Sequence, residues 1–122
     1  MELDFKKDND IGIIKISGRL VVSNAREFKE NINKYIEQSR FLVLDLTDMD
    51  YIDSLGLGSL INCYKSITEN DGDLYIAGLQ SKPKTLFQIT KAYLIFSIFD
   101  NVEEAIASLK QKIFSAVSQS RV

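Results

Sequence analysis

The sequence predicts an α/β protein built on a mixed, mostly parallel β-sheet with helices packed on it. Apolar stretches of strand length alternate along the chain with amphipathic stretches of helical spacing. Residues 41–46 are apolar on both faces except at Asp45, as expected of a central parallel strand covered by helices. With 122 residues, 45% of them hydrophobic, the chain supports one core. We therefore expect a single domain over residues 1–122, folded through residue 117, with a frayed tail at 118–122.

The expected element order is β-β-α-β-α-β-α-β-α. The first two strands, at 2–7 and 11–20, form an antiparallel hairpin, and Ser23 or Asn24 then caps an amphipathic helix that ends near residue 38. The later elements are a strand at 41–46, a helix from about 54 to the turn at 69–72, a strand at 74–77, a short helix starting at 81–83, an edge strand at 96–99, and a closing helix capped by Asp100 or Asn101.

Composition excludes several classes of function. The net charge is −2 and no cluster of lysine and arginine forms a face, so we expect no nucleic-acid partner. The absence of histidine removes His-based catalytic triads and most transition-metal sites, and no cofactor is predicted. The N-terminal residues have no secretory character and no apolar run is long enough to span a bilayer, so we expect a cytoplasmic protein without membrane contact. Cys63 lies on the apolar side of a helix, and we expect it in the core.

The segment 49–60 contains the strongest functional signal. It places Ser54 between an apolar strand and an apolar helix, with a carboxylate before it and two glycines after it. Either Ser54 or Asp53 is a suitable N-cap for the helix. Because the first N–H groups of a helix lack partners within the helix, we expect a phosphate on Ser54 to find hydrogen-bond donors without movement of the backbone.

Enzymatic interpretations of this segment fail on specific residues. A serine hydrolase needs a glycine where Ile52 stands and a base to take the serine proton, which a chain without histidine lacks. A dinucleotide-binding loop needs a third glycine where Ile61 stands. Four aspartates lie close together, but Tyr51 and Ile52 break the spacing of a calcium loop, and a solvated acidic loop is the simpler interpretation. These aspartates are Asp45, Asp48, Asp50 and Asp53.

The plain structural interpretation of Ser54 is a helix N-cap. Gly56 and Gly58 argue against that interpretation alone, because each glycine in a helix costs about 0.5–1 kcal/mol relative to alanine. The loss of two side chains would leave the start of the helix open to another protein. We therefore expect both glycines to form an open docking surface.

Residues 52–58, Ile-Asp-Ser-Leu-Gly-Leu-Gly, resemble the signature of the STAS domain family, and specifically of the bacterial anti-sigma factor antagonists. The resemblance extends over nearly the whole chain. Gly18-Arg19-Leu20 followed by Ala25 is similar to the block before the first helix of that family. Residues 42–46, 74–78 and 96–105 are similar to its central strand, next strand and C-terminal block.

The resemblance implies a regulatory binding protein, not an enzyme, that is switched by phosphorylation of Ser54. With Ser54 free it would bind an anti-sigma factor that is also a serine kinase, and so release a sigma factor. Phosphorylation would end the binding and a serine phosphatase would restore it. The protein would act as a monomer. The expected partner-binding residues are Val21, Val22, Ser23, Asn24, Asp53, Leu55, Gly56, Leu57 and Gly58.

An alternative is a STAS-type scaffold or ligand-sensing module in which Ser54 is only a helix cap. Three positions depart from the family pattern. Val21 stands where the family commonly has an aspartate, and Leu55 replaces a small residue after the serine. Lys91-Ala92 lies where a glycine often ends the third helix. These departures indicate a divergent member of the family.

Overall fold

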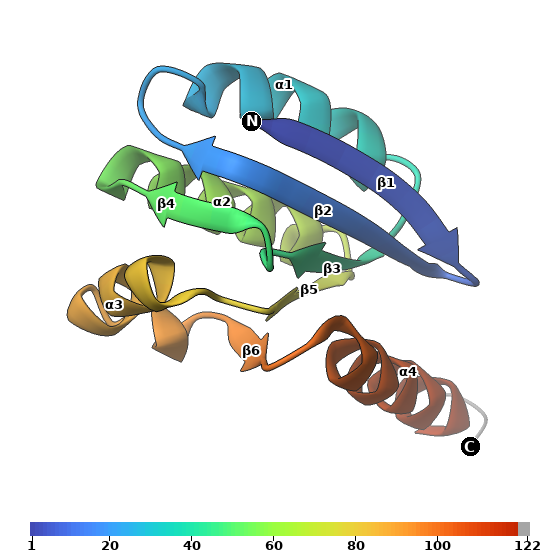
Figure 1. The fold of residues 1–122 in the computed structure, drawn as a ribbon. Coiled ribbons are helices and arrows are strands. Elements are labelled where there is room, and N and C mark those ends of the chain that lie inside the picture. Colours follow the sequence, from blue (N-terminus) through green and yellow to red (C-terminus); the bar gives the residue numbers. More distant parts are fainter. Residues whose placement is uncertain (120–122) are drawn as a thin grey trace.

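The computed structural model describes residues 1–119 and contains a six-stranded mixed sheet (Figure 1). Its main path runs β1-β2-β3-β5-β6, and β4 pairs with β2 off this path. Only β1 and β2 are antiparallel; the other pairs are parallel, which confirms the predicted sheet. The strands are β1 (Glu2–Asp8), β2 (Ile11–Leu20), β3 (Phe41–Asp45), β4 (Met49–Ile52), β5 (Asp73–Ala77) and β6 (Ser97–Phe99).

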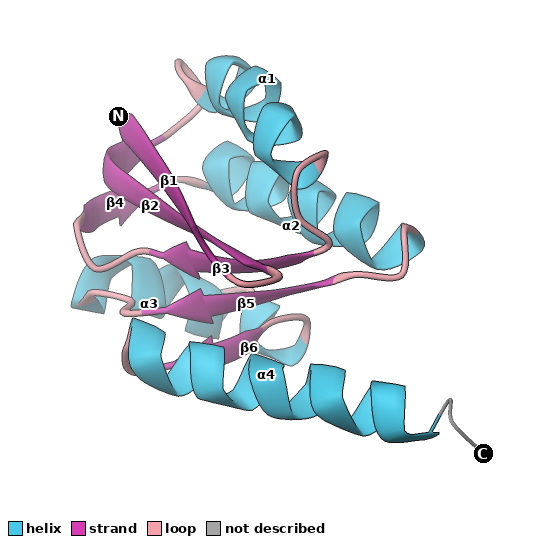
Figure 2. Ribbon diagram, turned by 90° about the vertical axis from the view of Figure 1, so that its right-hand side faces the viewer, coloured by secondary structure: helices cyan, strands magenta, loops and turns pink. Residues whose placement is uncertain are grey.

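Helices cover both faces of the sheet. Figure 2 shows α1 and α2 on one side and α4 on the other, and two buried clusters correspond to these layers. Phe28 of α1 and Leu60 of α2 belong to the larger cluster, whereas Leu109 of α4 belongs to the smaller one. The helices are α1 (Ala25–Ile36), α2 (Ser54–Glu69), α3 (Ser81–Ile89), the 3₁₀ helix η1 (Ala92–Leu94) and α4 (Val102–Gln119). None of these described helices has the length and apolar character needed to cross a bilayer.

Strand β4 and helix η1 were absent from the expected element order, which is therefore incomplete. Residues 49–52 carry the burial pattern buried-exposed-exposed-buried, so they lack the alternation by which a half-buried strand is predicted. The strand forms because β2 is longer than β3 and continues past it. A register shift between Gly18 and Arg19 lets the end of β2 pair with β4.

The ends of three helices refine the expected boundaries. Asn24 occupies the N-cap position of α1 but makes no side-chain cap hydrogen bond. Asn101, rather than Asp100, caps α4, because its Oδ1 accepts a hydrogen bond from the backbone N–H of Glu104 at 2.9 Å. Lys91, after α3, has a left-handed φ of 60°, a conformation that glycine usually supplies. Helix α4 includes residues 118 and 119 of the segment expected to form the tail, and 120–122 lie outside the described residues.

Candidate functional site

The start of α2 lies at the edge of the sheet where the parallel strands end. Strand β4 ends at Ile52, directly before Asp53, and β2 ends beside it at Leu20 (Figure 1). The backbone N–H of Asp53 donates to the carbonyl oxygen of Leu20 at 3.2 Å. This contact brings the segment 21–24, which follows β2, against the first turn of α2.

The Asp53 carboxylate joins these two segments. Its Oδ1 accepts a hydrogen bond from the N–H of Gly56 at 2.7 Å, and its Oδ2 accepts one from the N–H of Val22 at 2.9 Å. Desolvation by itself raises the pKa of this carboxyl group. The hydrogen bonds from the backbone of Gly56, Val22 and Leu55, together with the charge of Arg19, outweigh that effect, and the pKa of Asp53 is lowered. Asp53 is therefore ionised, and its carboxylate holds the backbone N–H groups of Val22 and Gly56; we call this arrangement the Asp53 clamp.

Ser54 is the first residue of α2 and is exposed to solvent. Asp53 is the N-cap, so the interpretation of Ser54 as a plain helix cap is wrong. Two large apolar side chains beside it are also exposed, Val22 by 61% and Leu55 by 59%. The Asp53 carboxylate links the backbone of Val22 to that of Gly56, the residue after Leu55. The structure thus places an exposed hydroxyl at the start of α2 close to two exposed aliphatic side chains, one on α2 and one on the segment that follows β2.

The two glycines of the segment have different roles. A Cβ on Gly56 would lie 2.1 Å from the carbonyl oxygen of Leu20, so this glycine lets α2 pack against β2. A Cβ on Gly58 would have nothing within 4 Å. Gly56 is buried, which corrects the expectation that both glycines form an open surface, and Leu57, an expected partner contact, is buried as well. Gly58 alone matches the expected opening.

Two of the hydrogen-bond donors expected for a phosphate on Ser54 are already occupied. Asp53 already occupies the N–H of Gly56 through its side chain and the N–H of Leu57 through its carbonyl oxygen at 2.9 Å. A phosphate on Ser54 would therefore meet an ionised carboxylate at the helix start. Its charge would add to that of Asp53, and the N–H groups of Gly56 and Leu57 would not be available to it.

The segment 21–24 is shaped by Asn24, whose structural role the sequence did not indicate. Its Oδ1 accepts from the N–H of Val21 at 2.9 Å, and its Nδ2 donates to the carbonyl oxygen of Arg19 at 2.8 Å. The side-chain amide of Asn24 thus ties the end of this segment back to the backbone at residues 19–21. Ser23, the other expected cap, is exposed. The guanidinium carbon of Arg19 lies 5.0 Å from the centroid of the Tyr51 ring, a cation–π contact that only the pairing of β4 with β2 reveals.

The remaining residues singled out in the sequence lie apart from this surface. Asp45 accepts hydrogen bonds from Thr47, and Asp48 forms an ion pair with Lys15 at 2.8 Å, so these carboxylates have separate partners. In residues 1–119 no group of three or more potential ligand residues could hold a metal ion. Cys63 is buried as predicted, and desolvation raises the pKa of its thiol to about 12.

Comparison with known proteins places these features in a family. The chain is 32% identical over 99 residues to the anti-sigma-B factor antagonist of Listeria monocytogenes, a match that covers 80% of this chain and 86% of that protein. It is 32% identical over 78 residues to the anti-sigma-B factor antagonist of Staphylococcus aureus, covering 63% and 72%.

Solved structures agree with this relationship. A putative anti-sigma factor antagonist from Thermotoga maritima has a TM-score of 0.83 at 25% identity, covering 88% of this chain and 94% of that one. The anti-sigma factor antagonist SpoIIAA in its unphosphorylated form shares the fold, with a TM-score of 0.76 at 14% identity, covering 90% and 97%. The family model described as the STAS domain matches residues 2–105. This chain therefore belongs to the STAS domain family.

Proposed function

We propose that this protein is a cytoplasmic anti-sigma factor antagonist that regulates sigma-factor-dependent transcription through Ser54. With Ser54 free, it binds an anti-sigma factor that is a serine kinase. Phosphorylation of Ser54 by that kinase ends the binding, and a serine phosphatase restores it. The protein acts as a monomer, without a cofactor and without catalysis of its own. The names of its relatives support the role, and the exposed hydroxyl of Ser54 beside exposed Val22 and Leu55 carries the site assignment.

The proposed docking surface consists of Ser54, Leu55 and Gly58 on α2 together with the segment 21–24. Val22 and Leu55 supply apolar area, and the absence of a side chain at Gly58 allows a close approach of the partner. We remove Gly56 and Leu57 from the expected partner contacts because both are buried in the free protein. Asp53 contributes by holding the two segments in register through its hydrogen bonds to Gly56 and Val22.

The same geometry explains how phosphorylation could end the binding without unfolding the protein. A phosphate adds about −1.5 to −2 charge at pH 7. On Ser54 that charge would lie at the centre of the docking surface and next to ionised Asp53. A partner covering it would have to remove water from two neighbouring anions, which is costly. Because Ser54 is exposed and outside the core, the fold would not change.

Binding experiments with matched variants test this proposal. Wild-type protein, Ser54→Asp and Ser81→Asp are immobilised, and proteins captured from a lysate are identified by mass spectrometry. Ser81 is the matched control because it is also exposed and is the first residue of a helix. We expect wild type and Ser81→Asp to capture a serine-kinase anti-sigma factor that Ser54→Asp does not capture. Equal capture by all three proteins would contradict the proposal.

Phosphorylation is tested with the captured kinase and ATP. Mass mapping should place the label on Ser54, and Ser54→Ala should accept none. Label on another residue, or none on wild type, would favour a STAS scaffold or ligand-sensing module instead. Amide NMR spectra of Ser54→Asp should differ from wild type only around residues 19–24 and 53–58. Shifts spread through the sheet would contradict a switch confined to the surface.

A further inference from the structure

A second candidate site lies between α3, η1 and β6. It is a pocket of about 560 Å³, and none of its lining residues belongs to the docking surface around Ser54. Pockets that hold small ligands commonly measure about 300–1,000 Å³ and combine an apolar lining with a few polar groups. This pocket has both kinds of lining residues, and their chemistry limits the ligand that it could accept.

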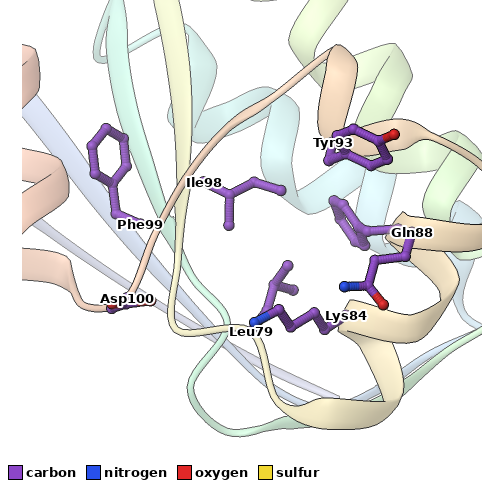
Figure 3. Close-up of a pocket in the computed structure, with 8 residues that line it drawn as sticks. Leu79, Lys84, Gln88, Tyr93, Ile98, Phe99 and Asp100 are labelled. Carbon is purple, nitrogen blue, oxygen red and sulfur yellow. The ribbon is translucent and has the colours of Figure 1, made fainter.

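The apolar wall is formed by Leu79, Phe87 and Ile98. Phe87 is almost fully buried, and Leu79 and Ile98 pack against the same core cluster. Phe96 supports Phe87 from behind, with ring centroids 5.8 Å apart. Figure 3 shows Leu79 and Ile98 pointing into the space between β6 and α3. An apolar ligand body at this position would extend the hydrophobic core outward.

The polar wall is formed by Lys84 and Gln88, which lie one turn apart on α3 and extend along the same edge of the pocket (Figure 3). Lys84 is the only cation among the described residues that line the pocket. Within residues 1–119 its ammonium group has no ion-pair partner within 4.0 Å. The ammonium of Lys84 and the amide of Gln88 are therefore free to donate hydrogen bonds to an anion.

The charge of the site limits the kind of anion. Lys84 supplies one positive charge to the lining and Asp100 one negative charge, so the pocket favours the anion with the smallest charge. A doubly charged phosphate would be repelled by the Asp100 carboxylate about twice as strongly as a singly charged carboxylate, which disfavours the phosphate. A carboxylate carries one charge and has two oxygens, one for the ammonium of Lys84 and one for the amide of Gln88.

We propose that this pocket binds a small monocarboxylate with an apolar body. The carboxylate is held by Lys84 and Gln88, and the apolar body covers Leu79, Phe87 and Ile98. The inference goes beyond the regulation of Ser54 and does not depend on it. If the pocket does not bind such a compound, the proposed function of the docking surface is unaffected.

Methyl NMR titration of the full chain tests the proposal. The probes are 3-phenylpropanoate and the matched neutral alcohol 3-phenylpropan-1-ol. We expect saturable shifts of the Leu79 and Ile98 methyl groups, with tighter binding of the carboxylate than of the alcohol. Because Lys84 is exposed to solvent, Lys84→Met should weaken carboxylate binding about twofold to fivefold, the size expected for an exposed ion pair, and should leave alcohol binding unchanged. Lys82→Met, on the same helix but outside the pocket, is the control and should behave as wild type.

Three results would overturn the proposal. The first is the absence of saturable shifts at Leu79 and Ile98. The second is a Lys84→Met variant that binds the carboxylate as tightly as wild type. Unchanged carboxylate binding by Gln88→Leu would count against the polar wall in the same way. The third is a set of shifts confined to the groove beside Ile113 on α4, which would place the binding elsewhere.

Discussion

Alanine at Gly58 and alanine at Gly56 should have opposite effects on stability. A methyl group at position 58 would meet no atom within 4 Å beyond the adjacent backbone of its own helix. It should therefore stabilise the protein by about 0.5–1 kcal/mol, through the higher helix propensity of alanine. A methyl group at position 56 would lie 2.1 Å from the oxygen and 2.8 Å from the carbon of the Leu20 carbonyl. These are backbone atoms of β2, which cannot rotate away. Gly56→Ala should therefore destabilise by at least about 1–3 kcal/mol, as overpacking does.

The assay is urea unfolding followed by circular dichroism, together with a titration of each variant against the captured anti-sigma factor. Gly58→Ala should be more stable than wild type and yet bind more weakly, because the new methyl group occupies the docking surface. A stability gain combined with normal binding would refute the assignment of Gly58 to the interface. A loss of stability in Gly58→Ala, or none in Gly56→Ala, would refute the packing argument itself.

Four further outcomes are expected. Ser54→Ala should unfold within about 0.5 kcal/mol of wild type in urea, because an exposed N1 residue carries no cap. Asp53→Ala should lose about 0.5–2 kcal/mol at pH 7. The pKa of Asp53 is lowered in the folded state, so the stability difference between wild type and Asp53→Ala is present above about pH 4. It should shrink as the pH falls through the folded-state pKa. Urea unfolding at about pH 7 and about pH 3 measures the difference. Cys63 should resist a thiol reagent at pH 8 until the protein is unfolded, because burial raises the pKa of its thiol. The hydrogen bond and charge of Asp73 raise the pKa of Lys112. Because the Lys112 side chain is largely exposed, Lys112→Met should lose only about 1 kcal/mol or less of stability, measured by thermal unfolding at pH 7. This loss should vanish as the pH rises past the raised pKa of Lys112.

The sequence predicted the sheet and the four main helices because apolar periodicity records which face of each element is buried. It did not predict β4, whose burial depends on the extension of β2 beyond β3. That pairing is non-local and leaves no periodic signal in residues 49–52. The contact of Arg19 with Tyr51 was not predicted for the same reason.

Within the candidate site, the sequence located the start of α2 but could not separate the roles of its residues. Asp53 and Ser54 are both good caps by type, and only the backbone geometry assigns the cap to Asp53. The sequence alone does not distinguish Gly56 from Gly58. A side chain at position 56 would clash with the carbonyl group of Leu20, whereas position 58 faces open space. Distinctions of this kind depend on neighbours that are distant along the chain.

The carboxylate of Asp53 accepts hydrogen bonds from main-chain N–H groups, one in the segment 21–24 and one in the first turn of α2. Amide donors are present whatever side chain a residue carries, proline excepted. The side chains at Val22 and Leu55 are therefore free to diversify during evolution while the scaffold beneath them stays the same. Under the proposed function, paralogous copies in one cell could use different residues at these two positions to bind different partners. An engineer could redirect partner choice by exchanging the residues at 22 and 55 and leaving the clamp untouched.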